Sequence, residues 1–167
     1  MLSIHEKLKL YEVLPHLGLP SNKGNGNINL WDYKQRKNLV LFFHHGFKCP
    51  RCSSKLVEIA SAYPQIQAEE AEVLAISFDS LKDAEAFSEK MRVQFRLLSD
   101  TKNGDSAAFT YVDEAKKGLY PSLFITDRFS ALRYQKIVEE ADRLPPVKEI
   151  VDWLELIQLE CPECSHL

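Results

Sequence analysis

Apolar positions recur with two different spacings along the chain, and together they predict strands alternating with helices. Residues 39–43 and 73–78 are largely apolar on both faces, which is typical of central strands in a parallel sheet covered on both sides. Between them, four apolar residues at helical spacing within residues 56–63 predict a helix that Pro64 should end. A strand–helix–strand unit of this kind forms a right-handed crossover between parallel strands.

The same patterns predict the remaining elements. Ser80 followed by Asp83 resembles a capping box, which should open a helix with one apolar face. We expect a half-buried strand at residues 28–32, a short extended stretch at 95–98, a short helix at 103–111, two strands at 121–126 and 132–138, and a last helix after Pro146. The chain therefore begins with a βαβ unit and ends with a ββα unit.

The length of 167 residues predicts one domain, large enough to bury a core without disulfide bonds. A Gly- and Asn-rich loop at residues 21–27 should separate an N-terminal segment, residues 1–27, from the main body. We place this main domain at residues 28–160 and a cysteine-containing tail at residues 161–167.

Composition excludes several classes of partner. The chain is 45% hydrophobic and 27% charged with a formal net charge of -3, so no excess of Lys and Arg indicates nucleic acid or an anionic membrane. No apolar run approaches the roughly 18 to 20 residues of a membrane-spanning helix. The first residues lack the pattern of a signal peptide, so we expect a cytoplasmic protein.

Four cysteines form two C-x-x-C pairs, Cys49 with Cys52 and Cys161 with Cys164. In a reducing compartment such pairs indicate redox chemistry or metal binding more often than structural disulfides. The first pair lies between a predicted buried strand and a predicted helix, which is the redox arrangement. Inert half-buried cysteines and half of a zinc site remain alternatives.

The surroundings of Cys49 should favour its thiolate. The start of a helix stabilises an anion, and Pro50 suits the first helical turn. Lys48 and Arg51 add positive charge, and His45 or its neighbour His44 would do so when protonated. Adjacent strand residues point to opposite faces, so at most one of the two histidines should approach the dithiol.

Spacing also predicts how the dithiol works. Two intervening residues bring Cys52 within about one helical turn of Cys49, close enough for a disulfide. We expect the more exposed Cys49 to attack a substrate disulfide and Cys52 to release the product by attacking Cys49. Cys49 and Cys52 are therefore the candidate catalytic residues.

Residues 28–32 and 38–52 resemble the thioredoxin-like superfamily, in particular its redoxin branch, which includes the alkyl hydroperoxide reductase/thiol-specific antioxidant (peroxiredoxin) family. The likeness extends from about residue 28 to residue 158. It implies a three-layer α/β thioredoxin fold with a central mixed sheet flanked by helices. It also implies a disulfide-containing protein or small molecule as substrate, a thiol electron donor and no cofactor.

Tyr120 and Pro121 precede an apolar strand and resemble the cis-proline element of this superfamily. The resemblance implies that Pro121 is cis and that the backbone beside it pairs with an extended substrate. Phe47 and Lys48 stand where thioredoxins commonly have a Trp before the dithiol, which leaves substrate preference open. We assign Phe47, Tyr120 and Pro121 to substrate contact.

A peroxiredoxin-like peroxidase, with Cys49 attacking a peroxide, is the second hypothesis. Its family motif resembles P-x-x-x-T-x-x-C, yet the proline and threonine positions before Cys49 hold Phe42 and Gly46. Counted from Cys52 they hold His45 and Cys49, and no arginine occurs in residues 120–126, where the family arginine usually lies. We therefore rank a disulfide reductase first.

The second pair, Cys161 and Cys164, allows three interpretations. It could pass electrons to the first pair or resolve an intermediate, it could complete a four-thiolate zinc module with the first pair, or it could be an idle tail. If the zinc module is correct, the protein has a structural or interaction role and is not an enzyme. We assign no metal ligand and no catalytic role to the tail.

Overall fold

The computed structural model describes residues 4–160 and contains one central mixed sheet. Its strand order is β5-β4-β3-β8-β9. The strands are β3 (Asn38–Phe43), β4 (Ala71–Ser77), β5 (Arg96–Ser99), β8 (Ser122–Thr126) and β9 (Leu132–Ile137). β3 pairs in parallel with β4, and β4 with β5, whereas β8 is antiparallel to both β3 and β9.

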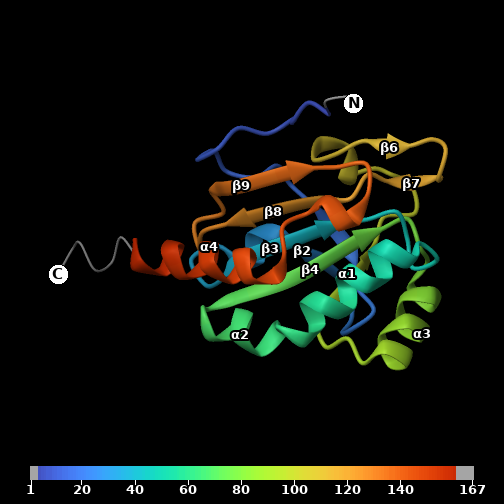
Figure 1. Ribbon diagram of the computed structural model, residues 1–167, viewed down its shortest axis with the longest axis horizontal. Coiled ribbons are helices and arrows are strands. Elements are labelled where there is room, and N and C mark those ends of the chain that lie inside the picture. The colour runs from blue at the N-terminus through green and yellow to red at the C-terminus, as the bar shows by residue number, and fades with distance from the viewer. Residues whose placement is uncertain (1–3, 161–167) are drawn as a thin grey trace.

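Helices cover one face of this sheet. They are α1 (Pro50–Ser61), α2 (Tyr63–Ala68), α3 (Leu81–Met91) and α4 (Val147–Leu159). In Figure 1, α1, α2 and α4 lie in front of the strands, and their apolar residues share one buried cluster with Val40 and Phe42 of β3. The predicted thioredoxin-type fold, a mixed sheet flanked by helices, is confirmed.

The other face of the sheet is covered by shorter elements. They are β1 (Gly18–Pro20), β2 (Asn27–Asn29), the hairpin strands β6 (Val112–Asp113) and β7 (Gly118–Leu119), and the 3-10 helices η1 (Leu30–Tyr33) and η2 (Ser106–Ala108). The 3-10 helix η3 (Ala141–Arg143) instead contacts α1 on the helical face. Leu17 and Leu30 are fully buried in the cluster on this face. The N-terminal segment therefore supplies part of the core.

β3 is the middle strand of the sheet, and every one of its residues is buried. The apolar run from Leu39 to Phe43 suits a sheet covered on both faces, and the predictions for β3 and β4 are confirmed. Ser80 also caps α3 as predicted, since its hydroxyl accepts the N–H of Asp83 at 3.2 Å. Of the helices in residues 4–160, none has both the length and the apolar character that crossing a membrane requires.

Two predicted elements differ from the structure in extent or type. The strand predicted at residues 28–32 ends at Asn29, because Asp32 turns back to accept the Asn29 N–H at 3.3 Å and a 3-10 turn follows. The helix predicted at 103–111 is only the short η2. There the Asp100 carboxylate accepts the N–H groups of Gly104 and Ser106 at 3.0 and 2.8 Å, which stabilises a turn instead.

Pro64 has a different effect from the one expected. The first helix ends at Ser61, and Pro64 lies in the first turn of a second helix, α2. Proline has no N–H to donate, and the first turn of a helix needs none, so the residue is compatible with a helix start. The helical conformation is interrupted at one residue, Ala62, and resumes at Tyr63.

Candidate active site

The Cys-Pro-Arg-Cys motif spans the start of α1, as the sequence predicts. Cys49 is the residue before the helix and has an extended backbone, and Pro50 lies in the first helical turn. The Cys49 carbonyl accepts the Ser53 N–H at 2.9 Å, and the Cys49 N–H donates to the Gly46 carbonyl at 3.2 Å. Cys49 is therefore the capping residue at the positively polarised end of α1.

The two cysteines of this motif are free thiols in different environments. Cys49 is half-buried, whereas Cys52 is 0% exposed. Burial, reinforced by a hydrogen bond with Cys49, raises the pKa of the Cys52 thiol to about 12. Cys52 therefore waits as a protonated thiol beside the more accessible sulfur of Cys49.

His45 connects both sulfurs to a carboxylate. Its Nδ1 lies 3.9 Å from the Cys49 Sγ and 3.8 Å from the Cys52 Sγ. Its Nε2 lies 2.9 Å from the Asp113 Oδ2, and only 2% of the imidazole is exposed. Burial lowers the pKa of His45, against the opposing effect of the hydrogen bond with Asp113. With Nε2 donating to Asp113, the lone pair of Nδ1 faces the sulfurs.

Asp113 reaches His45 through the short hairpin of β6 and β7, whose residue Gly118 packs directly on the His45 backbone. A Cβ atom at Gly118 would lie 2.2 Å from the His45 carbonyl oxygen, so only glycine allows this approach. Sequence reasoning missed Asp113, because strands of two residues leave no periodic pattern.

The turn between β3 and α1 depends on Gly46 and Asp79. Gly46 has a φ of 134°, a conformation that favours glycine. The Asp79 Oδ2 accepts the Phe47 N–H at 3.2 Å and the Ser77 hydroxyl at 2.7 Å. Asp79 thus holds the turn that presents Cys49, and its hydrogen bonds give it a structural role.

His44 points away from the dithiol into the core, as strand alternation requires for one of the two histidines. Its ring stacks on Phe42 and tilts against Phe47 at centroid distances of 5.2 and 5.4 Å. Its Nδ1 accepts the Gly46 N–H at 3.1 Å. Full burial and the proximity of His45 lower the pKa of His44 to about 3, so it is neutral and structural.

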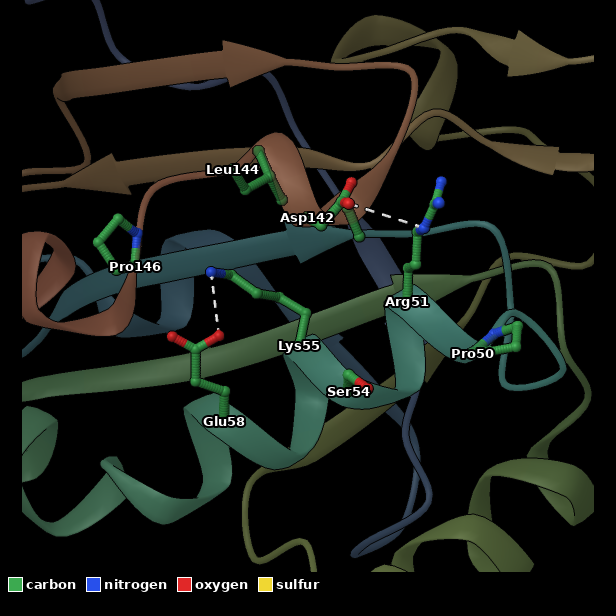
Figure 2. Close-up of a pocket in the computed structure, with 9 residues that line it drawn as sticks. Pro50, Arg51, Ser54, Lys55, Glu58, Asp142, Leu144 and Pro146 are labelled. Atoms are coloured by element: carbon green, nitrogen blue, oxygen red, sulfur yellow. Dashed lines mark ion pairs between the residues drawn. The ribbon is translucent and has the colours of Figure 1, made fainter.

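The two cationic side chains predicted near Cys49 differ in their exposure and in their ion-pair partners. Lys48 is exposed and lines the same cavity as Cys49. Arg51 pairs with Glu140 at 3.2 Å and with Asp142 at 3.7 Å, and Figure 2 shows it turned toward Asp142. Sequence reasoning missed Lys116, which also pairs with Glu140 at 2.5 Å.

Glu140 and the Cys49 sulfur both interact electrostatically with Arg51 and Lys116. The pKa of Arg51 is raised mainly by its hydrogen bond with Glu140, and Cys49 contributes in the same direction. The pKa of Lys116 is raised by the same two neighbours. Arg51 and Lys116 therefore lie within electrostatic reach of Cys49, although Glu140 takes most of their attraction.

The residues assigned to substrate contact are not all at the dithiol. The Tyr120 ring lies 6.3 Å from the His45 ring, close to the site. The Phe47 ring stacks on Phe87 of α3 at 4.6 Å, so it packs against the helix layer.

Pro121 corrects one prediction, because none of the peptide bonds in residues 4–160 is cis. Its carbonyl accepts the Val138 N–H at 2.9 Å, and the preceding Tyr120 N–H donates to the Tyr111 carbonyl at the same distance. These bonds fix the segment in the trans form, which is the intrinsically favoured isomer. Pro121 itself is buried and directly precedes β8.

Two cavities flank the dithiol. One, of about 500 Å³, is lined by His45, Cys49, Lys48 and Lys116, among others. The other, of about 420 Å³, lies between α1 and the segment before α4 (Figure 2). There Lys55 pairs with Glu58 at 3.2 Å and donates to the Pro145 carbonyl at 2.6 Å. Of these two cavities, only the first has a cysteine, Cys49, in its lining.

The same side chains could hold a soft cation. Nδ1 of His45 and the Sγ atoms of Cys49 and Cys52 all lie within 4.8 Å of one another, and they form the one such cluster found in residues 4–160. The alternative zinc module also needs Cys161 and Cys164, which lie outside the described residues.

Comparison with known proteins gives a family and a set of relatives. The model of the AhpC/TSA family matches residues 11–135. Peroxiredoxin bcp1 of Schizosaccharomyces pombe is 35% identical over 100 residues, which are 60% of this chain and 51% of that protein. Chloroplastic peroxiredoxin Q of Gentiana triflora is 29% identical over 102 residues, 61% of this chain and 46% of that protein. The chain spans about half the length of these curated relatives.

Solved structures extend the likeness of the fold to most of the chain. A reduced 2-Cys peroxiredoxin of Plasmodium vivax superposes with a TM-score of 0.80 at 17% identity, covering 90% of this chain and 97% of that one. Peroxidoxin BcpB of Mycobacterium tuberculosis gives 0.78 at 20% identity, covering 90% and 98%. At these identities the likeness concerns the fold alone.

Proposed function

The chain belongs to the AhpC/TSA family, and from this premise we propose that it is a thiol peroxidase in which Cys49 attacks the peroxide and Cys52 resolves the product. One observation carries the proposal. Half-buried Cys49 lines a cavity of about 500 Å³, and the fully buried Cys52 lies beside it. The sequence alone ranked a disulfide reductase first, and the relatives named peroxiredoxins reverse that order.

The first step oxidises Cys49. Its thiolate attacks the terminal oxygen of a hydroperoxide, an S–O bond forms, and the O–O bond breaks. The departing alkoxide takes a proton and leaves as the alcohol, so Cys49 becomes a sulfenic acid. Cys49 lies at the start of α1, and Lys48 and Lys116 line the same cavity, so positive charge surrounds the sulfur that attacks in this step.

The second step forms the disulfide. The Cys52 sulfur attacks the sulfenic sulfur of Cys49, and the hydroxyl leaves as water. The Cys52 proton has an acceptor in the lone pair of His45 Nδ1, 3.8 Å from the sulfur. An external thiol donor then reduces the disulfide by exchange, supplying two electrons and two protons.

Disulfide reduction by the same dithiol is the second candidate function. The positions of the family threonine and arginine, which assist the attack on peroxide, are not occupied by those residues near Cys49. Arg51 does not replace that arginine, because it is turned toward Glu140 and Asp142. A dithiol without these groups remains competent for thiol–disulfide exchange, which requires the two sulfurs alone.

One experiment separates the two functions. Reduced protein is supplied with a dithiol donor, and consumption of hydrogen peroxide and of an organic hydroperoxide is compared with reduction of insulin disulfides. We expect peroxide consumption to dominate and Cys49→Ser to reduce it to background. A double variant, Cys161→Ser with Cys164→Ser, is the control and should keep the activity. Insulin reduction without peroxide consumption would establish the second candidate instead, and full activity in Cys49→Ser would overturn both.

A further inference from the structure

The convergence of one imidazole nitrogen and two sulfurs has a use beyond redox chemistry. We propose that the reduced protein binds one Zn²⁺ through His45 Nδ1, Cys49 Sγ and Cys52 Sγ. Two thiolates and one imidazole are ligands that Zn²⁺ prefers over the other abundant divalent cations. The proposal concerns binding and does not depend on the peroxidase activity.

The distances suit a tetrahedral ion. Zn–S bonds of about 2.3 Å and Zn–N bonds of about 2.0 Å imply ligand atoms roughly 3.5 to 3.8 Å apart. The Nδ1 of His45 lies 3.9 and 3.8 Å from the two sulfurs, and all three atoms lie within 4.8 Å of one another. Small movements of the half-buried Cys49 are enough to complete the geometry.

A carboxylate already orients the imidazole as a metal site requires. Asp113 accepts the Nε2–H of His45 at 2.9 Å, with the two side chains only 12% and 2% exposed. Histidines that bind zinc generally donate their other N–H to such a group, which fixes the tautomer and the ring orientation. Here the pair leaves the Nδ1 lone pair directed at the two sulfurs.

The charge balance and the space around the site also fit a divalent cation. Two neighbouring thiolates, one of them on the fully buried Cys52, are costly without a compensating charge. Zinc supplies that charge. The cavity of about 500 Å³ at Cys49 leaves room for a water molecule as fourth ligand, so the site needs no cysteine from residues 161–167.

Zinc binding and oxidation of the dithiol exclude each other. A hydroperoxide and two protons convert the two zinc-bound thiolates into a disulfide, releasing the alcohol, one water and the Zn²⁺ ion. The reduced dithiol therefore holds the ion, and oxidation of the dithiol by peroxide releases it. In this way peroxide controls how much Zn²⁺ the protein holds.

The test uses full-length reduced protein with Cys161→Ser and Cys164→Ser, so that the tail thiols cannot contribute. Co²⁺ is titrated first, because thiolate ligation gives a charge-transfer absorption and tetrahedral ligand-field bands. Zn²⁺ is then added in competition with a chromophoric chelator. We expect one ion per chain, and loss of the charge-transfer signal in Cys49→Ser and in Cys52→Ser.

Two carboxylate variants test the orientation of His45. Asp113→Asn should weaken Zn²⁺ binding by about 10- to 100-fold, as is usual when the group behind a zinc-bound histidine is changed. Asp142→Asn removes another acidic group near the dithiol, 3.7 Å from Arg51, and should leave the affinity unchanged. Circular dichroism of each variant establishes that it is folded.

The outcomes are distinct. Absence of stoichiometric Zn²⁺ from the double tail variant, with binding by the unaltered protein, would overturn the proposal in favour of a site that uses the tail cysteines. Equal affinities for Asp113→Asn and Asp142→Asn would overturn the role of His45. Zinc binding without peroxide consumption would leave this inference standing and contradict only the proposed function.

Discussion

Two adjacent histidines at the end of β3 lie on opposite faces of the sheet and in different environments. On one face, His44 is enclosed by Phe42 and Phe47, and its Nδ1 accepts a backbone N–H. On the other, His45 lies against two sulfurs and a carboxylate beside an open cavity. Both imidazoles are buried, so burial alone does not distinguish the candidate site residue from the structural one.

The difference lies in what each face receives from distant parts of the chain. The His44 face receives apolar rings, among them Phe87 of α3 behind Phe47. The His45 face receives the start of α1 and the β6–β7 hairpin, which supply sulfur and carboxylate. A strand end thus becomes a chemical site through the partners packed against one side of it.

The largest effect is expected from disturbing the close backbone contact between Gly118 and His45. Gly118→Ala places a Cβ 2.2 Å from the His45 carbonyl oxygen, which backbone shifts must relieve. We expect a loss of about 3 kcal/mol in unfolding free energy, the upper end for overpacking, together with lower peroxidase activity. Chemical denaturation measures the first quantity.

Gly104→Ala is the matched control for this change. A Cβ at Gly104 meets nothing within 4 Å, so its effect should stay within about 0.5 kcal/mol. Similar stabilities for the two variants would show that the hairpin does not hold His45 as tightly as we infer.

A smaller effect is expected on the opposite face. His44→Leu keeps the apolar contacts but removes the acceptor for the buried Gly46 N–H, which should cost about 1 to 2 kcal/mol. The variant should retain its activity per folded molecule and its affinity for Zn²⁺. Urea denaturation and the peroxide assay together check this. Loss of activity at unchanged stability would contradict the structural role of His44.

The smallest effect concerns the edge of the His45 face. Glu140→Gln releases Arg51 and Lys116 from a shared carboxylate, so both cations can attract the Cys49 thiolate. Because the groups are solvent-screened, alkylation of Cys49 should accelerate only about two- to five-fold. The rate is measured with iodoacetamide at slightly acidic pH.

Asp152→Asn is the control for Glu140→Gln. It breaks another surface ion pair, Lys148 with Asp152 at 3.0 Å on α4, and should not change the alkylation rate. Equal rates in both variants and the unaltered protein would mean that Glu140 does not compete with Cys49 for the cations.

The same comparison explains what could be predicted from the sequence. Local patterns suffice for β3, for the helix start at Cys49 and for the alternation of His44 and His45, because each depends on neighbouring residues. Asp113 could not be predicted, since it reaches His45 through a pairing 68 residues away in the chain. The helix expected at residues 103–111 failed because the Asp100 side chain takes its first N–H groups.

The comparison with known proteins also reversed the ranking of the two candidate functions, disulfide reductase and peroxidase. The departures from P-x-x-x-T-x-x-C before Cys49 favoured a disulfide reductase, whereas the relatives named peroxiredoxins favour the proposal of a peroxidase. A short motif records only the residues next to one cysteine. The family match covers residues 11–135, which include both cysteines of the first pair and much of the sheet around them.

Mass spectrometry of the oxidised protein tests the central claim most directly. The variant with Cys161→Ser and Cys164→Ser is reduced, freed of metal and treated with one equivalent of hydrogen peroxide. We predict the loss of two hydrogen atoms from the intact mass and a peptide in which Cys49 is linked to Cys52. Cys49 oxidised to a sulfinic acid beside an unreacted Cys52, or two unmodified thiols, would contradict the account.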